Sequence, residues 1–64
     1  MKLHIPDMSC GHCVATIEKA VKATDPLAIV RPDLASHTAE IETSISTAAV
    51  IEVLESAGYP STAV

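Results

Sequence analysis

A chain of 64 residues buries only about 60% of the surface that its unfolded form exposes, so the deep pocket of an elaborate enzyme is not expected. Apolar residues make up 48% of the chain, but Tyr59 is its only Phe, Tyr or Trp, so the core must consist of Val, Ile, Leu and Ala in a thin two-layer fold. The net charge of -4 and the lack of a basic cluster argue against nucleic acid as a partner, and no apolar stretch approaches the length of a membrane span.

The first residues, MKLHIPD, predict a short strand and not a secretion signal. Leu3 and Ile5 alternate with polar residues, as in a strand with one buried face, and Pro6 and Asp7 end it. The same interruption comes too early for the apolar core of a signal peptide. The chain as given is therefore expected to be soluble and cytosolic.

A helix is predicted over residues 12–23. Val14, Ile17 and Val21 recur at i, i+3 and i+7, which places them in one apolar stripe, with charged residues on the other side. The Asp-Pro pair at 25–26 then breaks the chain.

Two strands follow this break. Apolar residues at alternate positions predict the second strand at 28–34, and Pro32 within it indicates a sheet edge, because proline cannot donate to the hydrogen-bond ladder. After a turn at 35–37 the stretch HTAEIET alternates again, with Ala39 and Ile41 facing inward.

A second helix and a last strand complete the chain. Ser46 or Thr47 can cap this helix, and Gly58 supplies the left-handed residue that ends it. Its apolar stripe consists of Val50, Val53, Leu54 and Ala57. With YPSTAV as a short strand, the order βαββαβ predicts an α+β, ferredoxin-like open-faced sandwich: a four-stranded antiparallel sheet with two helices on one face. We expect one domain over residues 1–64.

The motif MSCGHC holds the only two cysteines of the chain. Cys10 falls in the loop after the first strand and Cys13 in the first turn of the first helix, where free N–H groups and the helix dipole stabilise a thiolate. In a reducing cytosol a lone C-x-x-C is more often a metal or redox site than a structural disulfide. Two soft thiolates can hold Cu(I) in a near-linear arrangement, in a loop that stays open to an incoming thiol.

Three segments resemble the heavy-metal-associated domain family, in particular its small bacterial copper chaperones. They are M-S-C-G-H-C after the first strand, C-V-x-x-I-E-K-A-V along the first helix and E-S-A-G-Y at the end of the second. The resemblance spans essentially the whole chain. It implies that Cys10 and Cys13 bind Cu(I) and pass it to related domains of copper-transporting P-type ATPases.

Residues near the motif have less specific roles. In the family, a Met at the place of Met8 packs into the core, and we expect this of Met8 in preference to a thioether ligand. His12 could complete a third coordination position, but a solvated place on the helix is favoured; His4 and His37 are expected to have surface roles. The Tyr59 hydroxyl can hydrogen-bond the sulfurs without binding the metal, or the ring simply caps the small core.

Other function classes share the motif. C-G-H-C is also the active-site motif of protein disulfide isomerases, but those sites lie in thioredoxin folds, usually after a Trp, where this chain has Ser9. A metal domain of a transporting ATPase, or a zinc or mercury carrier, would share fold and motif. Zinc-preferring members often have Asp before the first Cys, and mercury-binding periplasmic members would carry a signal peptide. The favoured interpretation is a copper chaperone, not an enzyme.

Transfer is expected to begin at Cys10, the more exposed thiolate, and to end at Cys13, which the helix holds. Two such sites brought face to face could share Cu(I), so a copper-bridged homodimer is a further expectation.

The acceptor is expected to dock around the motif, over His12, Ala15 and Lys19 of the first helix and Tyr59 of the neighbouring loop. Lys19 and Lys22 are the local cations in an acidic chain, which predicts carboxylates on the acceptor.

Overall fold

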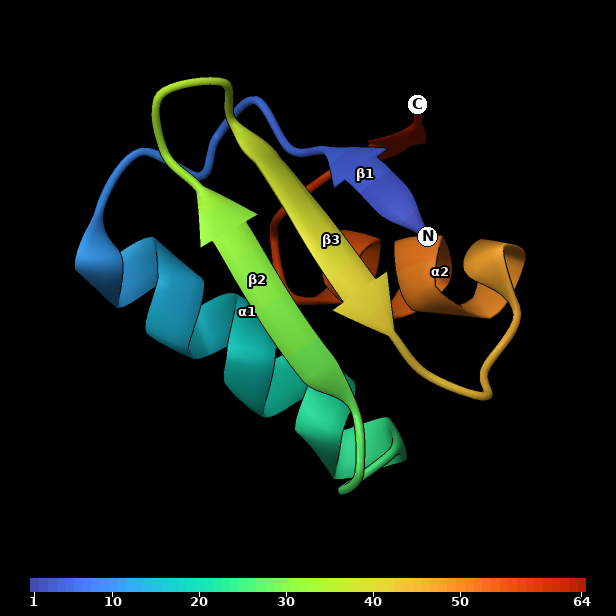
Figure 1. The fold of residues 1–64 in the computed structure, drawn as a ribbon. Coiled ribbons are helices and arrows are strands. Elements are labelled where there is room, and N and C mark those ends of the chain that lie inside the picture. Colours follow the sequence, from blue (N-terminus) through green and yellow to red (C-terminus); the bar gives the residue numbers. More distant parts are fainter.

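The computed structural model describes all residues from 1 to 64 and contains two helices and four strands in the predicted order (Figure 1). The first three elements are β1 (Lys2–His4), α1 (Gly11–Thr24) and β2 (Ile29–Asp33). The last three are β3 (Thr38–Glu42), α2 (Thr47–Ser56) and β4 (Thr62–Ala63). The predicted ferredoxin-like fold is confirmed, with α1 one residue longer at each end than the sequence pattern indicated.

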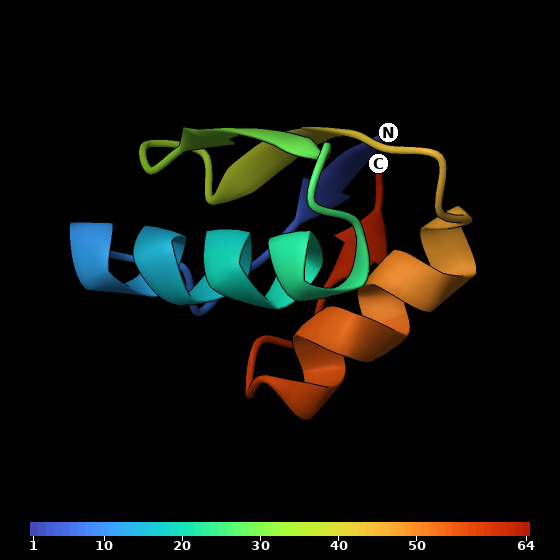
Figure 2. The same ribbon diagram turned by 90° about the horizontal axis from the view of Figure 1, so that it is seen from below.

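The four strands form one antiparallel sheet in the order β2-β3-β1-β4, and both helices lie on the same face of it (Figure 2). The edge strands are therefore β2 and β4. Pro32 in β2 pairs with Ala39 of β3, and its other side has no strand neighbour. A proline is tolerated there because an edge strand needs donors on one side only, as the sequence predicted.

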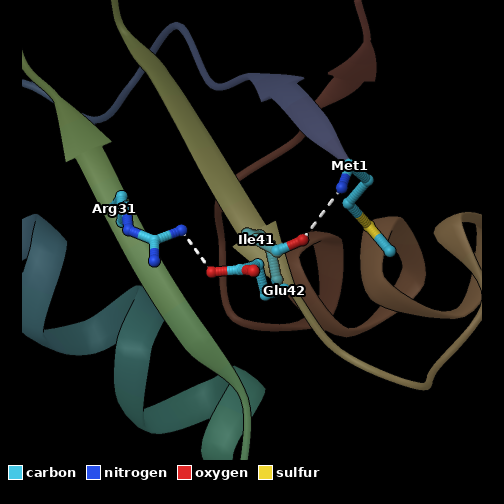
Figure 3. A network of polar contacts seen from close by, with 4 residues as sticks. All are labelled: Met1, Arg31, Ile41 and Glu42. Atoms are coloured by element: carbon cyan, nitrogen blue, oxygen red, sulfur yellow. Dashed lines mark hydrogen bonds and ion pairs between the residues drawn. The ribbon is translucent and has the colours of Figure 1, made fainter.

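Strand β3 is joined to the start of the chain on one side and to β2 on the other (Figure 3). The amino group of Met1 donates to the Ile41 carbonyl at 2.9 Å, and the Ile41 N–H donates to the Met1 carbonyl at 2.7 Å. The Arg31 guanidinium pairs with the Glu42 carboxylate on the exposed face. An exposed pair of this kind contributes less than about 1 kcal/mol, so backbone bonds and core packing hold the register.

The core lies between the sheet and the two helices and contains ten buried side chains, all apolar. Sheet and loops contribute Leu3, Ile5, Met8, Ala28, Ala39 and Ile41. The helices contribute Ile17, Val21, Val50 and Leu54. Full burial of one larger aliphatic side chain stabilises the fold by about 1.5–3 kcal/mol, so this small aliphatic set supplies most of the driving force.

The two helices begin differently. Ser46 caps α2, and its hydroxyl accepts the Ala49 N–H at 3.2 Å, as predicted. Cys10 caps α1, but its side chain makes no capping hydrogen bond. The first turn of α1 therefore keeps N–H groups that no capping side chain uses, and these groups lie beside the two sulfurs.

The second helix ends as the sequence predicts, whereas the strands at the two sheet edges are shorter than expected. Gly58 follows α2 with φ of +92°, the left-handed conformation predicted for it. Strand β2 is one residue shorter at each end than the alternation suggested, since Ala28 precedes it and Leu34 already belongs to the exposed turn that leads into β3. Strand β4 covers only Thr62–Ala63 of the six residues YPSTAV expected for the last strand. Neither helix of the molecule has the length and apolar character that crossing a membrane requires.

Candidate metal centre

Two thiols meet at the start of α1. Cys10 is its N-cap residue and Cys13 lies in its first turn, and their Sγ atoms are 3.1 Å apart. Both are free thiols; Cys10 is exposed and Cys13 is half-buried. The sequence predicted both positions, and the fold brings the two sulfurs together at the surface, where another protein can reach them.

The surroundings favour the thiolate form of Cys13. Its pKa is lowered from 9.0 to about 6, and the Tyr59 hydroxyl is the largest cause, followed by the backbone of Ser9 and the Cys10 side chain. Partial burial opposes these effects without cancelling them. Cys13 is therefore largely a thiolate at neutral pH, which is the form that binds soft metal ions.

Tyr59 reaches this site from the loop after α2. Its backbone N–H donates to the Leu54 carbonyl at 2.8 Å, and the Gly58 N–H donates to the Glu55 carbonyl at 3.0 Å, so the end of α2 fixes where the ring leaves the chain. The ring packs against the core, and the hydroxyl interacts with Cys13. The same interaction raises the pKa of Tyr59, because only the protonated hydroxyl can donate a hydrogen bond to the sulfur. Both roles considered for Tyr59, core cap and partner of the sulfur, are thus compatible with its position.

Met8 and His12 lie in different surroundings, one in the core and one at the surface. The Met8 side chain is fully buried among the core residues, which confirms its expected place there. His12 is exposed on the first turn of α1. The molecule contains no group of three His, Cys, Asp or Glu side chains placed to hold a metal ion, so His12 does not join the two cysteines in a three-ligand group.

His37 is the residue near the site whose contacts the sequence did not reveal. Its ring Nδ1 lies 2.9 Å from the Met8 carbonyl oxygen, in a half-buried position, so the expectation of a mere surface role is wrong. The sequence placed His37 in a turn but gave no sign of a contact across 29 positions. In the structure its backbone φ is 55°, an uncommon conformation for a non-glycine residue, although histidine is among the types enriched there.

The model of the heavy-metal-associated domain matches residues 2–60, most of the chain. The chain belongs to the heavy-metal-associated domain family. This domain is similar to a gold binding protein of known crystal structure, with 39% identity and a TM-score of 0.91 over 95% of this chain and 94% of that one. It is also similar to the copper chaperone Atx1 from Synechocystis PCC6803 in a trimeric form, with 29% identity and a TM-score of 0.95 over 97% and 98%. Oxidized MerP from Ralstonia metallidurans CH34 has 25% identity and a TM-score of 0.82 over 95% and 89%.

Proposed function

We propose that this heavy-metal-associated domain is a cytosolic copper chaperone that binds Cu(I) through Cys10 and Cys13 and transfers it to a metal-binding domain of a copper-transporting P-type ATPase. The observation that carries the proposal is the pair of sulfurs 3.1 Å apart at a surface loop, with one of them stabilised as a thiolate. Similarity to a copper chaperone of known structure supports it.

The number of ligands favours a soft ion of low coordination number. Structural zinc is almost always bound by four protein ligands, whereas this site offers two thiols and no third side chain of a suitable type. Two thiolates suit Cu(I), and the same chemistry suits Au(I). Similarity to a gold binding protein therefore supports a site for soft monovalent ions, of which copper is the proposed cargo.

Binding requires a small opening of the site. Linear coordination sets two sulfurs two metal–sulfur bond lengths apart, which is about 4.6 Å on the scale of zinc–thiolate bonds of about 2.3 Å and exceeds the 3.1 Å between the sulfurs in the structure. Cys13 belongs to the helix, so Cys10 in the exposed loop is the residue that moves. Transfer then proceeds by ligand exchange: an acceptor thiolate binds Cu(I), the bond to Cys10 breaks, and the bond to Cys13 breaks last, with no change of oxidation state.

Thiol–disulfide exchange is the main alternative, and the position of the stabilised thiolate disfavours it. An oxidoreductase attacks its substrate with an accessible thiolate. Here the thiol with the lowered pKa is Cys13, which is the less exposed of the two. The arrangement thus suits a ligand that retains the ion while Cys10 exchanges.

A competition titration tests the proposal. The reduced protein should take one equivalent of Cu(I) from a chromogenic chelator. In competition with chelators of matched affinity for each ion, it should bind Cu(I) more tightly than Zn(II). His12→Ala is the matched control, since His12 lies between the two cysteines and is not assigned as a ligand; its affinity should equal that of the wild type. Preference for Zn(II), or a strong loss of affinity in His12→Ala, would contradict the assignment of the site.

A copper-bridged homodimer follows from the same site. Two exposed loops brought face to face would present four thiolates to the shared ions. Size-exclusion chromatography across a Cu(I) titration in reducing buffer should show a dimer that grows as copper exceeds half an equivalent. A species that stays monomeric beyond one equivalent would remove this part of the proposal.

A further inference from the structure

Two side-chain hydrogen bonds fix the geometry of the loop that carries the motif, residues 5–10, which we name the motif loop. One joins Cys10 to Cys13, and the other joins the His37 ring to the Met8 carbonyl. The second comes from the turn between β2 and β3, residues 34–37, which lies beside the start of α1 in Figure 2.

His37 holds this loop at two points. Its backbone carbonyl accepts the Ile5 N–H at 2.6 Å, and its ring Nδ1 lies 2.9 Å from the Met8 carbonyl oxygen. Because a carbonyl only accepts, Nδ1 must carry the proton of this bond. The ring meets this condition when Nδ1 is protonated, whereas the neutral ring protonated only on Nε2 does not.

The backbone of His37 indicates that the ring is needed there. With φ of 55° it is the only non-glycine residue with a positive φ, a conformation that glycine or asparagine adopts more easily. Glycine would relieve the strain but would leave the Met8 carbonyl without its partner. The hydrogen bond of the ring offsets the strain that the residue carries.

The turn that presents His37 is itself well braced. The Asp33 carboxylate accepts the Ala35 N–H at 3.0 Å, and the hydroxyls of Ser36 and Thr38 are 2.7 Å apart on either side of His37. Asp33 and Thr38 are also register partners in the β2–β3 ladder. The ring therefore extends from a fixed base and not from a loose loop.

We propose that His37 is the positioning residue of the motif loop, anchoring residues 5–8 to the β2–β3 turn while Cys10 stays free to move. The buried Met8 side chain anchors the same segment to the core. Only Ser9 and Cys10 lie between the last anchored residue and the start of α1. This short free segment confines movement to the one sulfur that has to shift when an ion enters or leaves.

The consequence for metal binding rests on the proposed function. A loop that is already ordered loses less conformational entropy when it closes on an ion. Partners that orient metal ligands directly change affinity by about 10–100-fold when removed, and His37 acts one step further out. Loss of its ring should therefore weaken Cu(I) binding by about three- to tenfold.

Two substitutions separate the ring bond from the backbone. His37→Gly accepts the positive φ but removes the donor, whereas His37→Asn accepts the same φ and keeps an N–H donor near the position of Nδ1. Both should fold, and urea unfolding should show similar global stability for the two. Any difference between them at the motif loop then reports the donor.

Nitrogen-15 NMR of the reduced protein without copper gives the first readout. The neutral His37 ring should carry its proton on Nδ1. The Met8 amide, which donates to the Ile5 carbonyl at 3.0 Å, should exchange with solvent at least severalfold faster in His37→Gly and at nearly the wild-type rate in His37→Asn. The Gly58 amide in the loop after α2, which donates to the Glu55 carbonyl of the helix, is the internal control and should not change.

A neutral ring protonated on Nε2, or a Met8 amide that exchanges equally in all three proteins, would overturn the proposal. Cu(I) competition on the same three proteins gives the second readout, with weaker binding expected in His37→Gly alone. Equal Cu(I) affinity in His37→Gly and wild type would show that the anchor has no bearing on the site. If the wild type bound no Cu(I), the proposed function would fail, while the NMR result would still decide the positioning role.

Discussion

The two ends of α1 are joined to the sheet by comparable polar contacts, yet only one end keeps reactive groups free. At the far end, the Asp25 carboxylate accepts the Thr43 hydroxyl at 2.6 Å and the Leu27 N–H at 3.1 Å, and Thr43 in turn accepts the Ile45 N–H at 3.2 Å. At the site end, His37 contacts the motif loop at Ile5 and Met8, and Cys10 lies beyond these contacts. At the far end the polar side chains are hydrogen-bonded within the protein, whereas at the site end the Cys10 sulfur is exposed.

This difference separates groups that stabilise from groups that act. Satisfied hydrogen bonds between two loops add to the free energy of unfolding. A site that exchanges a metal ion needs a ligand that is accessible and able to move. The residues around this ligand have to stay in place. Substitutions at the site end should therefore change metal binding more than stability, and substitutions at the far end should change stability more than metal binding.

The largest effect is expected from the cysteines. Cys13→Ser or Cys10→Ser removes one of two proposed soft ligands and should lower Cu(I) affinity by at least about 100-fold, measured by chelator competition. The melting temperature of Cys10→Ser should stay close to that of the wild type, because the Cys10 side chain is exposed and lies outside the core. A serine variant that keeps wild-type affinity would remove the assignment of that sulfur.

Tyr59→Phe should change the protonation of the site while leaving its two ligands in place. Without the hydroxyl, the pKa of Cys13 should rise from about 6 toward its ordinary value of 9.0, seen as a shifted midpoint in thiolate ultraviolet absorbance. Because the folded pKa is below the unfolded one, folding favours the thiolate. The resulting stability is fully present above pH 9.0 and is lost as pH falls through about 6. An unchanged midpoint in Tyr59→Phe would assign the lowered pKa to the helix start and the backbone alone.

A smaller effect is predicted for the exposed side of α1. Lys19 is exposed and makes no ion pair, whereas Lys22 lies 3.7 Å from Glu18. If the acceptor presents carboxylates there, Lys19→Glu should slow Cu(I) transfer severalfold at low salt, with little change in Cu(I) affinity. Lys22→Glu is the matched control and should slow transfer less, because Glu18 already offsets its charge. If stopped-flow measurements gave equal transfer rates and salt slopes for Lys19→Glu and wild type, these lysines would form only a solvent-exposed face of the helix, with no role in docking.

The smallest effect on metal binding is expected at the far end. Asp25→Asn weakens a carboxylate that accepts bonds from Thr43 and Leu27, and these bonds hold the pKa of Asp25 below its usual value. The stability they provide is present above the ordinary carboxyl pKa and is lost as pH falls through the lowered one. The melting temperature should fall by roughly 5 °C at neutral pH and by less in acid. Cu(I) affinity should not change, and a parallel loss of affinity would show that the two ends are coupled.

The fold was predictable because its signals are local. The apolar periods of residues 12–23 and 37–43, the cap at Ser46 and the positive φ at Gly58 each specify their own element without knowledge of the rest. Pro32 even indicated its place at the sheet edge. The boundaries of the first helix and of the first three strands differed by about one residue, because element ends depend on backbone bonds that sequence patterns do not resolve. The last strand starts three residues later than expected, at Thr62.

The site was predictable only in part. The spacing of Cys10 and Cys13 and their place at the start of α1 followed from the motif. The contact of His37 with Met8, across 29 positions, and that of Asp25 with Thr43, across 18, depend on how separate loops meet after folding. No local pattern encodes such contacts, so His37 was expected at the surface, and the brace at the far end was not anticipated.

The central claim is that two thiolates, and no third side chain, hold the ion. X-ray absorption at the copper edge, on the monomeric fraction that size-exclusion chromatography separates from the reduced, Cu(I)-loaded protein, tests it most directly. The account predicts Cu(I) bound by two sulfur atoms with short bonds and without nitrogen scatterers, in both the wild type and His12→Ala. A shell that contains an imidazole nitrogen, or that changes in His12→Ala, would contradict it.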